Sequence, residues 1–264
     1  MHLSSITPLI LTYNEAPNIR RCLERLVWAS RVVVMDSGST DGTLSICAEF
    51  PNVEVVIRAF DNHTAQWNHG LDRVLTPWVL TLDADYILND ECAREFESLP
   101  DGEKDRVWFG LFHYVTFGRR LRGTLYPPRA VLFDPSHHRY AQDGHTQSLL
   151  VQSGQQEILK SRIDHDDRKP LSRWLDSQRK YATLEAEKMS LATVVIGMPD
   201  RLRRMIWPAA PAAFFYTLFV KRLILDGWPG WFYVLQRTYA ELLLSLELLN
   251  RRLGDNQKPP NSQP

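Results

Sequence analysis

The chain has 264 residues, a length that suits one large domain or a domain with a substantial appendage. Hydrophobic residues make up 44% of the sequence and charged residues 23%, a composition that can bury a globular core. Basic and acidic residues number 31 each, so the net charge points neither to a nucleic acid nor to an acidic partner.

The cysteines and the N-terminus indicate the compartment. Cys22, Cys47 and Cys92 are an odd number without metal-type spacing, which favours a reducing compartment and structural thiols. Residues 1–5 lack a basic region followed by a long apolar run, so no secretory signal is visible. We therefore expect the chain in the cytosol.

Short apolar runs alternate with helical patterns through the first 85 residues. Apolar side chains recur at helical spacing from Ile19 to Val27, and a helix is expected near residues 63–74. The alternation predicts an α/β fold with a mostly parallel sheet and right-handed crossovers. Its strands are expected at residues 6–12, 31–35, 53–57 and 78–82.

Acidic residues follow three of these strands, at Glu15, Asp36 and the pair Asp83 and Asp85. Ligands bind beyond the carboxyl ends of the strands in such sheets. Asp83 and Asp85 point to the same side of an extended backbone, and their repulsion is relieved by water or a cation. Because Mg²⁺ prefers oxygen ligands, we predict a metal-diphosphate site, with a solvated acidic turn as the alternative.

The loop at residues 36–43 combines a carboxylate, two glycines and several hydroxyls, which suits contacts to a polar ligand. The sequence contains no Gly-x-Gly-x-x-Gly after the first strand and no Gly-x-x-x-x-Gly-Lys-Ser/Thr. Both omissions weigh against a dinucleotide-binding fold and a P-loop.

Four stretches of the sequence carry a family resemblance: residues 11–19, residues 33–43, Gln66-Trp67-Asn68 and residues 82–85. They resemble family 2 glycosyltransferases of the GT-A fold, and most closely the lipopolysaccharide core β-glucosyltransferase-like branch. They occur in the family's order and spacing over about a hundred residues.

The resemblance implies a role for each acid. Glu15 and Asp36 would contact the uridine or its equivalent, Asp85 would ligate Mg²⁺ or Mn²⁺ on the diphosphate, and Asp83 would lie close to the metal and the sugar or ribose. As alternatives, Glu15 is a first-turn acid and Asp36 caps a turn. The other donor-binding candidates are Thr12, Tyr13, Ser37, Gly38, Arg58, Gln66, Asn68 and Ala84. Of these, Arg58 could instead pair with an acid, and Gln66 and Asn68 could be exposed polar residues.

Residues 129–133 and 143–147 resemble the family's Arg-Leu-Phe strand and its His-Glu element. The resemblance places His145 at the metal and the leaving phosphates, but Thr146 stands where the family has a glutamate. Inverting transfer needs a base for the acceptor hydroxyl, and we assign it to Asp143, the nearest carboxylate. The patterns Ile163-x-His and Tyr181-Ala-x-x-Glu-Ala also resemble this branch and are expected to close the acceptor side of the cleft.

The C-terminal third is apolar and locally basic. Residues 201–204 precede an apolar run at residues 205–220, which is shorter than the roughly 20 residues that span a bilayer. Residues 235–249 are amphipathic. We predict a GT-A domain at residues 1–195, a helical membrane or oligomer interface at 196–253 and a disordered tail at 254–264. Ordinary core helices are the alternative.

The resemblance implies an inverting, metal-dependent hexosyltransferase that uses a nucleoside-diphosphate sugar, with a UDP-sugar favoured. We expect a cell-envelope glycan or a lipid-linked acceptor and a peripheral location on the cytosolic face of the inner membrane. Thr146 keeps a sugar-nucleotide-binding scaffold open. A sugar-nucleotide nucleotidyltransferase is less favoured, because the first strand is not followed by a glycine- and arginine-rich phosphate loop.

Overall fold

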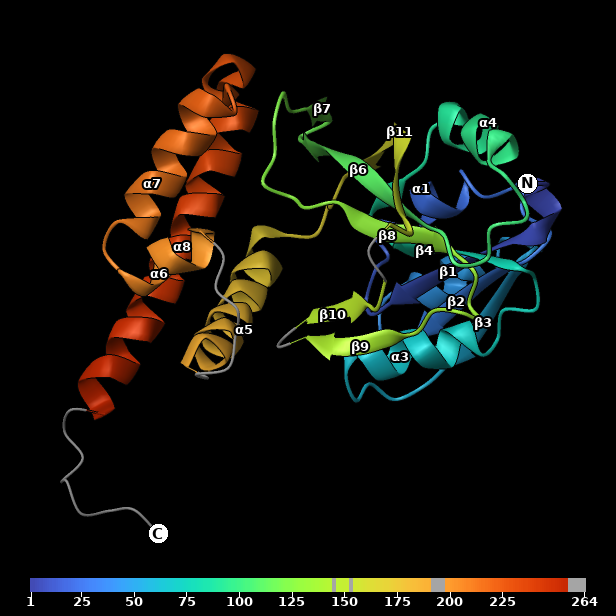
Figure 1. The fold of residues 1–264 in the computed structure, drawn as a ribbon, viewed down its shortest axis with the longest axis horizontal. Helices are drawn as coiled ribbons and strands as arrows, with labels where there is room; N and C mark the ends of the chain where they lie inside the picture. Colours follow the sequence, from blue (N-terminus) through green and yellow to red (C-terminus); the bar gives the residue numbers. More distant parts are fainter. Residues whose placement is uncertain (144–145, 152–153, 191–197, 256–264) are drawn as a thin grey trace, which may run out of the picture. The chain divides into compact units, whose positions relative to one another are not determined.

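A computed structural model describes residues 1–143, 146–151, 154–190 and 198–255. The chain forms two compact units (Figure 1). The first comprises residues 1–120 and 124–169, and the second comprises residues 121–123 and the chain from 170 onward. The predicted GT-A boundary at residue 195 lies further along the chain and stays a prediction.

The first unit is built on a mixed sheet with the strand order β3-β2-β1-β4-β8-β6-β11-β5, and β7 pairs with β6. β9 and β10 form a separate antiparallel pair. The strands are β1 (Ile6–Thr12), β2 (Val32–Asp36), β3 (Val53–Ile57), β4 (Trp78–Asp83), β5 (Tyr86–Ile87), β6 (Val107–Thr116), β7 (Arg119–Arg120), β8 (Arg129–Phe133), β9 (Tyr140–Asp143), β10 (Thr146–Leu149) and β11 (Gln156–His165).

The four strands expected at the N-terminus are confirmed, and their pairings with one another are parallel. β8 continues the sheet antiparallel to β4, and β11 lies parallel to β6. The helices of this unit are η1 (Leu3–Ser5), α1 (Ile19–Leu23), α2 (Thr43–Cys47), α3 (His63–Leu71) and α4 (Asp90–Ser98).

Two helices are shorter than their apolar patterns predicted. α1 ends at Leu23, and the chain continues in tight turns, in which the amides of Leu26 and Ala29 bond to carbonyls three residues back. Leu26 is still buried, but Val27 is 70% exposed. α3 ends at Leu71 in turns of the same kind. The apolar pattern in the sequence therefore extends past the end of each helix, because the tight turns that follow also bury every third side chain.

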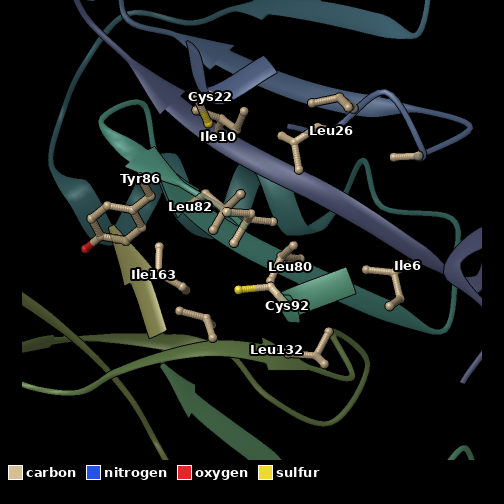
Figure 2. Close-up of a cluster of buried hydrophobic side chains, with 14 of the residues drawn as sticks. Ile6, Ile10, Cys22, Leu26, Leu80, Leu82, Tyr86, Cys92, Leu132 and Ile163 are labelled. Carbon is tan, nitrogen blue, oxygen red and sulfur yellow. The ribbon is translucent and has the colours of Figure 1, made fainter. Parts of the chain in front are cut away.

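Side chains on both faces of the sheet are buried, as parallel strands covered by helices require. Ile10, Leu80 and Leu82 pack on one face with Cys22 and Cys92 (Figure 2). The opposite face packs β1, β2 and β4 against α3, through Leu9, Met35, Val79 and Trp67. All three cysteines are buried and unpaired, in agreement with their interpretation as structural thiols.

The second unit is helical, and its longest helix, α8, packs against α5, α6, α7 and η3. Arg203 on α6 forms an ion pair with the buried Glu241 on α8, with 2.6 Å between Nη2 and Oε1. No helix in the described part of the chain is both long and apolar enough to cross a membrane. The elements are α5 (Leu171–Ser190), α6 (Met198–Arg204), α7 (Ala209–Phe215), the π-helix η2 (Tyr216–Val220), η3 (Leu223–Asp226) and α8 (Gly227–Asp255).

Gly230 is required by the close approach of α8 to η3. A Cβ atom at this position would lie 2.1 Å from the carbonyl oxygen of Leu223. We predict that Gly230→Ala lowers the free energy of unfolding by about 2 kcal/mol, because backbone atoms must move. Gly254→Ala in the same helix meets no atom within 4 Å and should be neutral or slightly stabilising. Urea unfolding followed by circular dichroism measures both variants, and equal stabilities would contradict the prediction.

Candidate functional site

The acids predicted from the strand ends lie at one edge of the sheet. Thr12, the last residue of β1, is in register with Asp36 on β2, and Leu11 is in register with Asp83 on β4. Glu15 follows β1 by three residues, and Asp85 follows β4 by two. The structure thus brings together carboxylates from three separate strand ends.

Asp36 organises the loop that follows β2. Its side chain is fully buried and accepts four hydrogen bonds, two at each oxygen. The amides of Gly38 and Ser39 donate to Oδ1 at 2.9 and 2.7 Å, and the hydroxyls of Thr12 and Ser39 donate to Oδ2 at 2.8 and 2.6 Å. Gly38 takes a φ of +86°, which glycine adopts without strain. The structure therefore shows the turn-capping contacts of Asp36, and its contact with a nucleotide stays a prediction.

The loops after β1 and β2 are joined through Asn14, which has a φ of 55°. Its side-chain oxygen accepts hydrogen bonds from the amides of Thr40 and Asp41, at 2.7 and 3.3 Å, and its own amide donates to Ser39 Oγ at 2.7 Å. Asparagine tolerates the left-handed region better than most residues. The sequence analysis did not identify this role, although an asparagine next to a strand end is a usable signal. The neighbouring candidate Tyr13 is 53% exposed.

Gln66 and Arg58 form a second junction, in which Gln66 is buried and Arg58 is partly exposed. Arg58 Nη1 donates to Gln66 Oε1 at 2.6 Å, and Gln66 Nε2 donates to Ser37 Oγ at 2.8 Å. Gln66 is only 1% exposed, so the alternative of a solvated polar residue is wrong for it. Asn68 exchanges hydrogen bonds with the backbone of Tyr140 and thereby joins α3 to β9. Arg58 also pairs with Asp61 at 2.5 Å, the alternative that its position suggested.

Glu15 is held by a lysine that the sequence analysis did not identify. Lys169 Nζ lies 2.7 Å from Glu15 Oε1, and Asn18 Nδ2 donates to Oε2 at 2.9 Å. Burial raises the pKa of Glu15, and Lys169 offsets only part of this increase. Glu15 in turn holds the pKa of Lys169 above its usual range, although burial acts in the opposite direction.

Asp83 and Asp85 are close enough for their charges to interact. Burial and the neighbouring Asp85 charge together raise the pKa of Asp83. Burial would also raise the pKa of Asp85, but His165 and Lys169 overcome this effect and lower it. Asp83 therefore takes up a proton more readily than Asp85 does.

His165 is the partner of Asp85. Its Nε2 atom lies 3.3 Å from Asp85 Oδ2, and both side chains are nearly buried. Residues 165 and 86 are in register between β11 and β5, and the amide of Asp166 donates to the carbonyl of Asp85 at 3.0 Å. Burial lowers the pKa of His165, but the negative charges of Asp85 and Asp83 raise it by a larger amount, so the net shift is upward. The Ile-x-His pattern was the sequence signal for this residue.

Aromatic rings fix the imidazole of His165. The Tyr126 ring stacks on it with centroids 4.5 Å apart, and the rings of Tyr114 and Tyr86 meet it edge-on. The hydroxyls of Tyr86 and Tyr126 are hydrogen-bonded at 2.6 Å. Arg129 lies over the Tyr126 ring, 5.6 Å from its centroid. This packing restricts His165 to one orientation toward Asp85.

A cavity of about 270 Å³ opens beside Asp83. Its lining includes one carboxylate, one guanidinium and several aromatic rings, a mixture suited to a polar ring-shaped ligand. A larger hollow of about 500 Å³ lies along α4 and β11, away from these acids. The main side chains around the smaller cavity are Trp67, Asp83, Tyr86, Arg129, Tyr140 and Ser148.

The side chains of both predicted catalytic residues lie outside the described part of the chain. Asp143 ends β9, but its side chain lies outside the described part of the chain, and His145 lies entirely outside it. The buried Ala84 separates the two aspartates and has no functional group of its own.

A divalent cation fits Asp85, and it fits His165 when the imidazole is neutral, because a protonated ring has no lone pair for a metal. Among the described residues, Asp85 Oδ1 and His165 Nδ1 are buried without a hydrogen-bond partner. Carboxylate oxygen and imidazole nitrogen are both common ligands of divalent metals. No group of three or more acidic, histidine or cysteine side chains in the described residues could hold a metal alone. A bound ion would therefore need further ligands, such as substrate phosphates.

Comparisons with known proteins agree with this organisation. Residues 8–136 match the family model described as glycosyl transferase family 2. The lipopolysaccharide core biosynthesis glycosyltransferase LpsC of Rhizobium meliloti is 30% identical over 94 residues, which are 34% of this chain and 34% of that protein. An uncharacterized glycosyltransferase of Rickettsia bellii is 34% identical over 93 residues, 35% of this chain and 31% of that protein. The matched segments span about a third of these relatives.

A solved structure extends the similarity to the fold. Mannosyltransferase PcManGT from Pyrobaculum calidifontis, in complex with GDP-Man and Mn²⁺, has a TM-score of 0.51 and 16% identity, covering 96% of this chain and 88% of that one. The expected GT-A fold is thereby confirmed.

Lys169 is expected to stabilise the site through Glu15. We predict that Lys169→Met lowers the free energy of unfolding by about 3 kcal/mol, because it leaves a buried carboxylate without its cation. The double variant Glu15→Gln, Lys169→Met should recover much of this loss. Lys104→Met, at an exposed lysine, is the control. Denaturant titration measures all three, and a Lys169 variant as stable as the control would contradict the prediction.

Proposed function

We propose that this chain, whose residues 8–136 belong to glycosyl transferase family 2, transfers a sugar from a nucleoside diphosphate to an acceptor hydroxyl. The observation that carries the proposal is the meeting of Asp83, Asp85 and His165 at the carboxyl edge of the sheet, where Asp83 also lines a cavity of mixed polar and apolar side chains. That edge is where ligands bind in open α/β sheets.

The nucleoside diphosphate would lie along the loops after β1 and β2. Glu15 and the loop held by Asp36 would contact the base and ribose, and Arg58, Gln66 and the hydroxyl of Ser37 support this wall. A UDP-sugar is favoured by the resemblance of these motifs. The PcManGT structure, which contains GDP-Man and Mn²⁺, supports a nucleotide-sugar donor of some kind.

Asp85 and His165 would hold Mg²⁺ or Mn²⁺ together with the diphosphate, with Asp83 close by. When bound, the ion would neutralise the negative charge that develops on the departing nucleoside diphosphate. The unpaired oxygen of Asp85 supports this role, because a buried carboxylate oxygen without a donor is costly unless a cation contacts it.

The cavity beside Asp83 would receive the sugar. Arg129 on β8, Tyr140 on β9 and Asp83 on β4 line it and carry the polar groups that could bond to sugar hydroxyls. In an inverting transfer, the acceptor oxygen bonds to the anomeric carbon as the bond to the diphosphate oxygen breaks. The Asp143 carboxylate takes the hydroxyl proton, and the nucleoside diphosphate leaves with the bonding electron pair.

The acceptor we propose is a cell-envelope glycan or a lipid-linked acceptor. The name of LpsC, a lipopolysaccharide core biosynthesis glycosyltransferase, supports this class. The second candidate function is a sugar-nucleotide-binding scaffold, which is favoured by Thr146 in the position of the expected glutamate. The relatives are named as glycosyltransferases, which gives no support to a nucleotidyltransferase.

Asp85→Asn tests the metal site. We predict that Mn²⁺ with the correct nucleotide sugar, found by screening a panel, raises the melting temperature of the unmodified chain. The variant should lose this metal-dependent shift and release nucleoside diphosphate about 100-fold more slowly, because it lacks the ligand charge. Asp90→Asn, at an exposed acid in α4, is the matched control. An Asp85 variant that behaves like this control would contradict the metal assignment.

Asp143→Asn tests the base. Loss of a general base should lower kcat by about 10²- to 10⁴-fold and leave donor binding within a few-fold. Steady-state release of nucleoside diphosphate with a varied donor separates the two constants. Turnover close to that of the unmodified chain would remove Asp143 from the mechanism. Donor binding without turnover in the unmodified chain would favour the scaffold instead.

A further inference from the structure

The second unit exposes several large apolar side chains where the chain passes from α7 into α8. We call residues 215–228 the hairpin tip. Trp228 is 85% exposed and Val220 63%, values more typical of lysine than of large apolar residues. The exposed large apolar side chains of the tip are Phe215, Tyr216, Phe219, Val220, Ile224, Leu225 and Trp228.

The hairpin tip is held firmly in this shape. Its inward side chains Leu218 and Leu223 are buried, and so is Asp226. Asp226 accepts hydrogen bonds from the amide and the guanidinium of Arg122, at 2.9 and 3.2 Å. Phe215 and Phe219 stack one helical turn apart, with ring centroids separated by 6.1 Å. The apolar side chains are therefore presented outward by an anchored backbone.

The charge of this surface is basic. From residue 205 to residue 235 the only acid in the sequence is Asp226, which is buried against Arg122. Lys221 and Arg222 lie among the exposed apolar side chains, and neither forms an ion pair among the described residues. Lys221 Nζ lies 5.7 Å from the centroid of the Tyr216 ring. The surface thus offers positive charge and apolar area without exposed negative charge.

We propose that the hairpin tip inserts into the headgroup region of a bilayer that contains anionic lipids. Trp and Tyr favour this region because their rings are apolar and their N–H and O–H groups remain hydrated. Lys221 and Arg222 attract anionic headgroups, while phenylalanine and leucine reach the acyl boundary. The inference concerns membrane attachment alone and does not depend on the proposed sugar transfer.

A second copy of the chain is the competing occupant. α8 also exposes a stripe with alternating spacings of three and four residues, the pattern of a helix-helix seam. The stripe consists of Leu235, Tyr239, Leu242, Leu246, Leu249 and Leu253. The positive charges of Lys221 and Arg222 favour the bilayer as the partner of the tip. If the hairpin tips of two copies packed against each other, these like charges would be brought together and would repel.

Vesicle sedimentation of the full chain tests the proposal. We expect binding to vesicles of phosphatidylcholine with 30% phosphatidylglycerol, and about 25-fold weaker binding after Lys221→Gln with Arg222→Gln, roughly fivefold for each charge. Phe219→Ser with Trp228→Ser should lose most of the binding. High salt and pure phosphatidylcholine vesicles, which need no variant, should each weaken it.

Matched controls lie on the first unit. Val27→Ser with Leu75→Ser removes two apolar side chains that are 70% and 84% exposed, and Arg94→Gln with Lys104→Gln removes two exposed charges. Both controls should bind vesicles like the unmodified chain, and circular dichroism should show all variants folded. Absence of vesicle binding, or tip variants that bind like the controls, overturns the proposal. A dimer that the tip variants convert to monomer, without vesicle binding, assigns the tip to a second copy instead.

Discussion

The structure depends on the balance of charge at the carboxyl edge of the parallel sheet. Glu15, Asp83 and Asp85 lie there with little exposure to water, opposed by Lys169 and His165. Lys169 neutralises Glu15 and His165 faces Asp85, while Asp83 has no ion pair among the described residues. Two neighbouring buried carboxylates with one imidazole favour an additional positive charge. A metal-bound diphosphate would meet this requirement at the edge where the fold places its ligands.

The N-terminal half of this arrangement could be predicted because its signals are local. Each of the four strands is a short apolar run, and a parallel sheet brings their carboxyl ends to one edge without further information. His165 and Lys169 were harder to assign, because they reach the edge through the pairing of β11 with β5, about 80 residues apart in sequence. Only the Ile-x-His resemblance marked that region. His145 was predicted from a motif resemblance and Asp143 as the nearest carboxylate to it, and neither has a described side chain to compare.

The loops at this edge show a second limit of sequence analysis. Asp36 was interpreted as a ligand contact with a turn cap as the alternative, yet most of its hydrogen-bonding capacity, and of that of Asn14, goes to backbone amides and hydroxyls of the loop itself. Local composition cannot separate the two roles, because a short polar side chain that shapes a loop and one that binds a ligand have the same chemistry. The internal bonds keep the loop in one conformation before any ligand arrives, which reduces the entropy lost on binding.

The apolar C-terminal region required the structure for a different reason. The sequence shows that residues 205–220 are too short to span a bilayer, but it does not show which of their side chains are buried. In the structure α7 and η2 use Ala209, Ala210 and Leu218 for packing and leave Phe215 and Phe219 outside. Burying a phenylalanine or leucine side chain gains about 1.5–3 kcal/mol. Seven exposed large apolar residues therefore represent a substantial gain that the isolated chain does not use. The adjacent Lys221 and Arg222, which form no ion pair with any residue that the structure describes, make an anionic bilayer the surface best able to provide it.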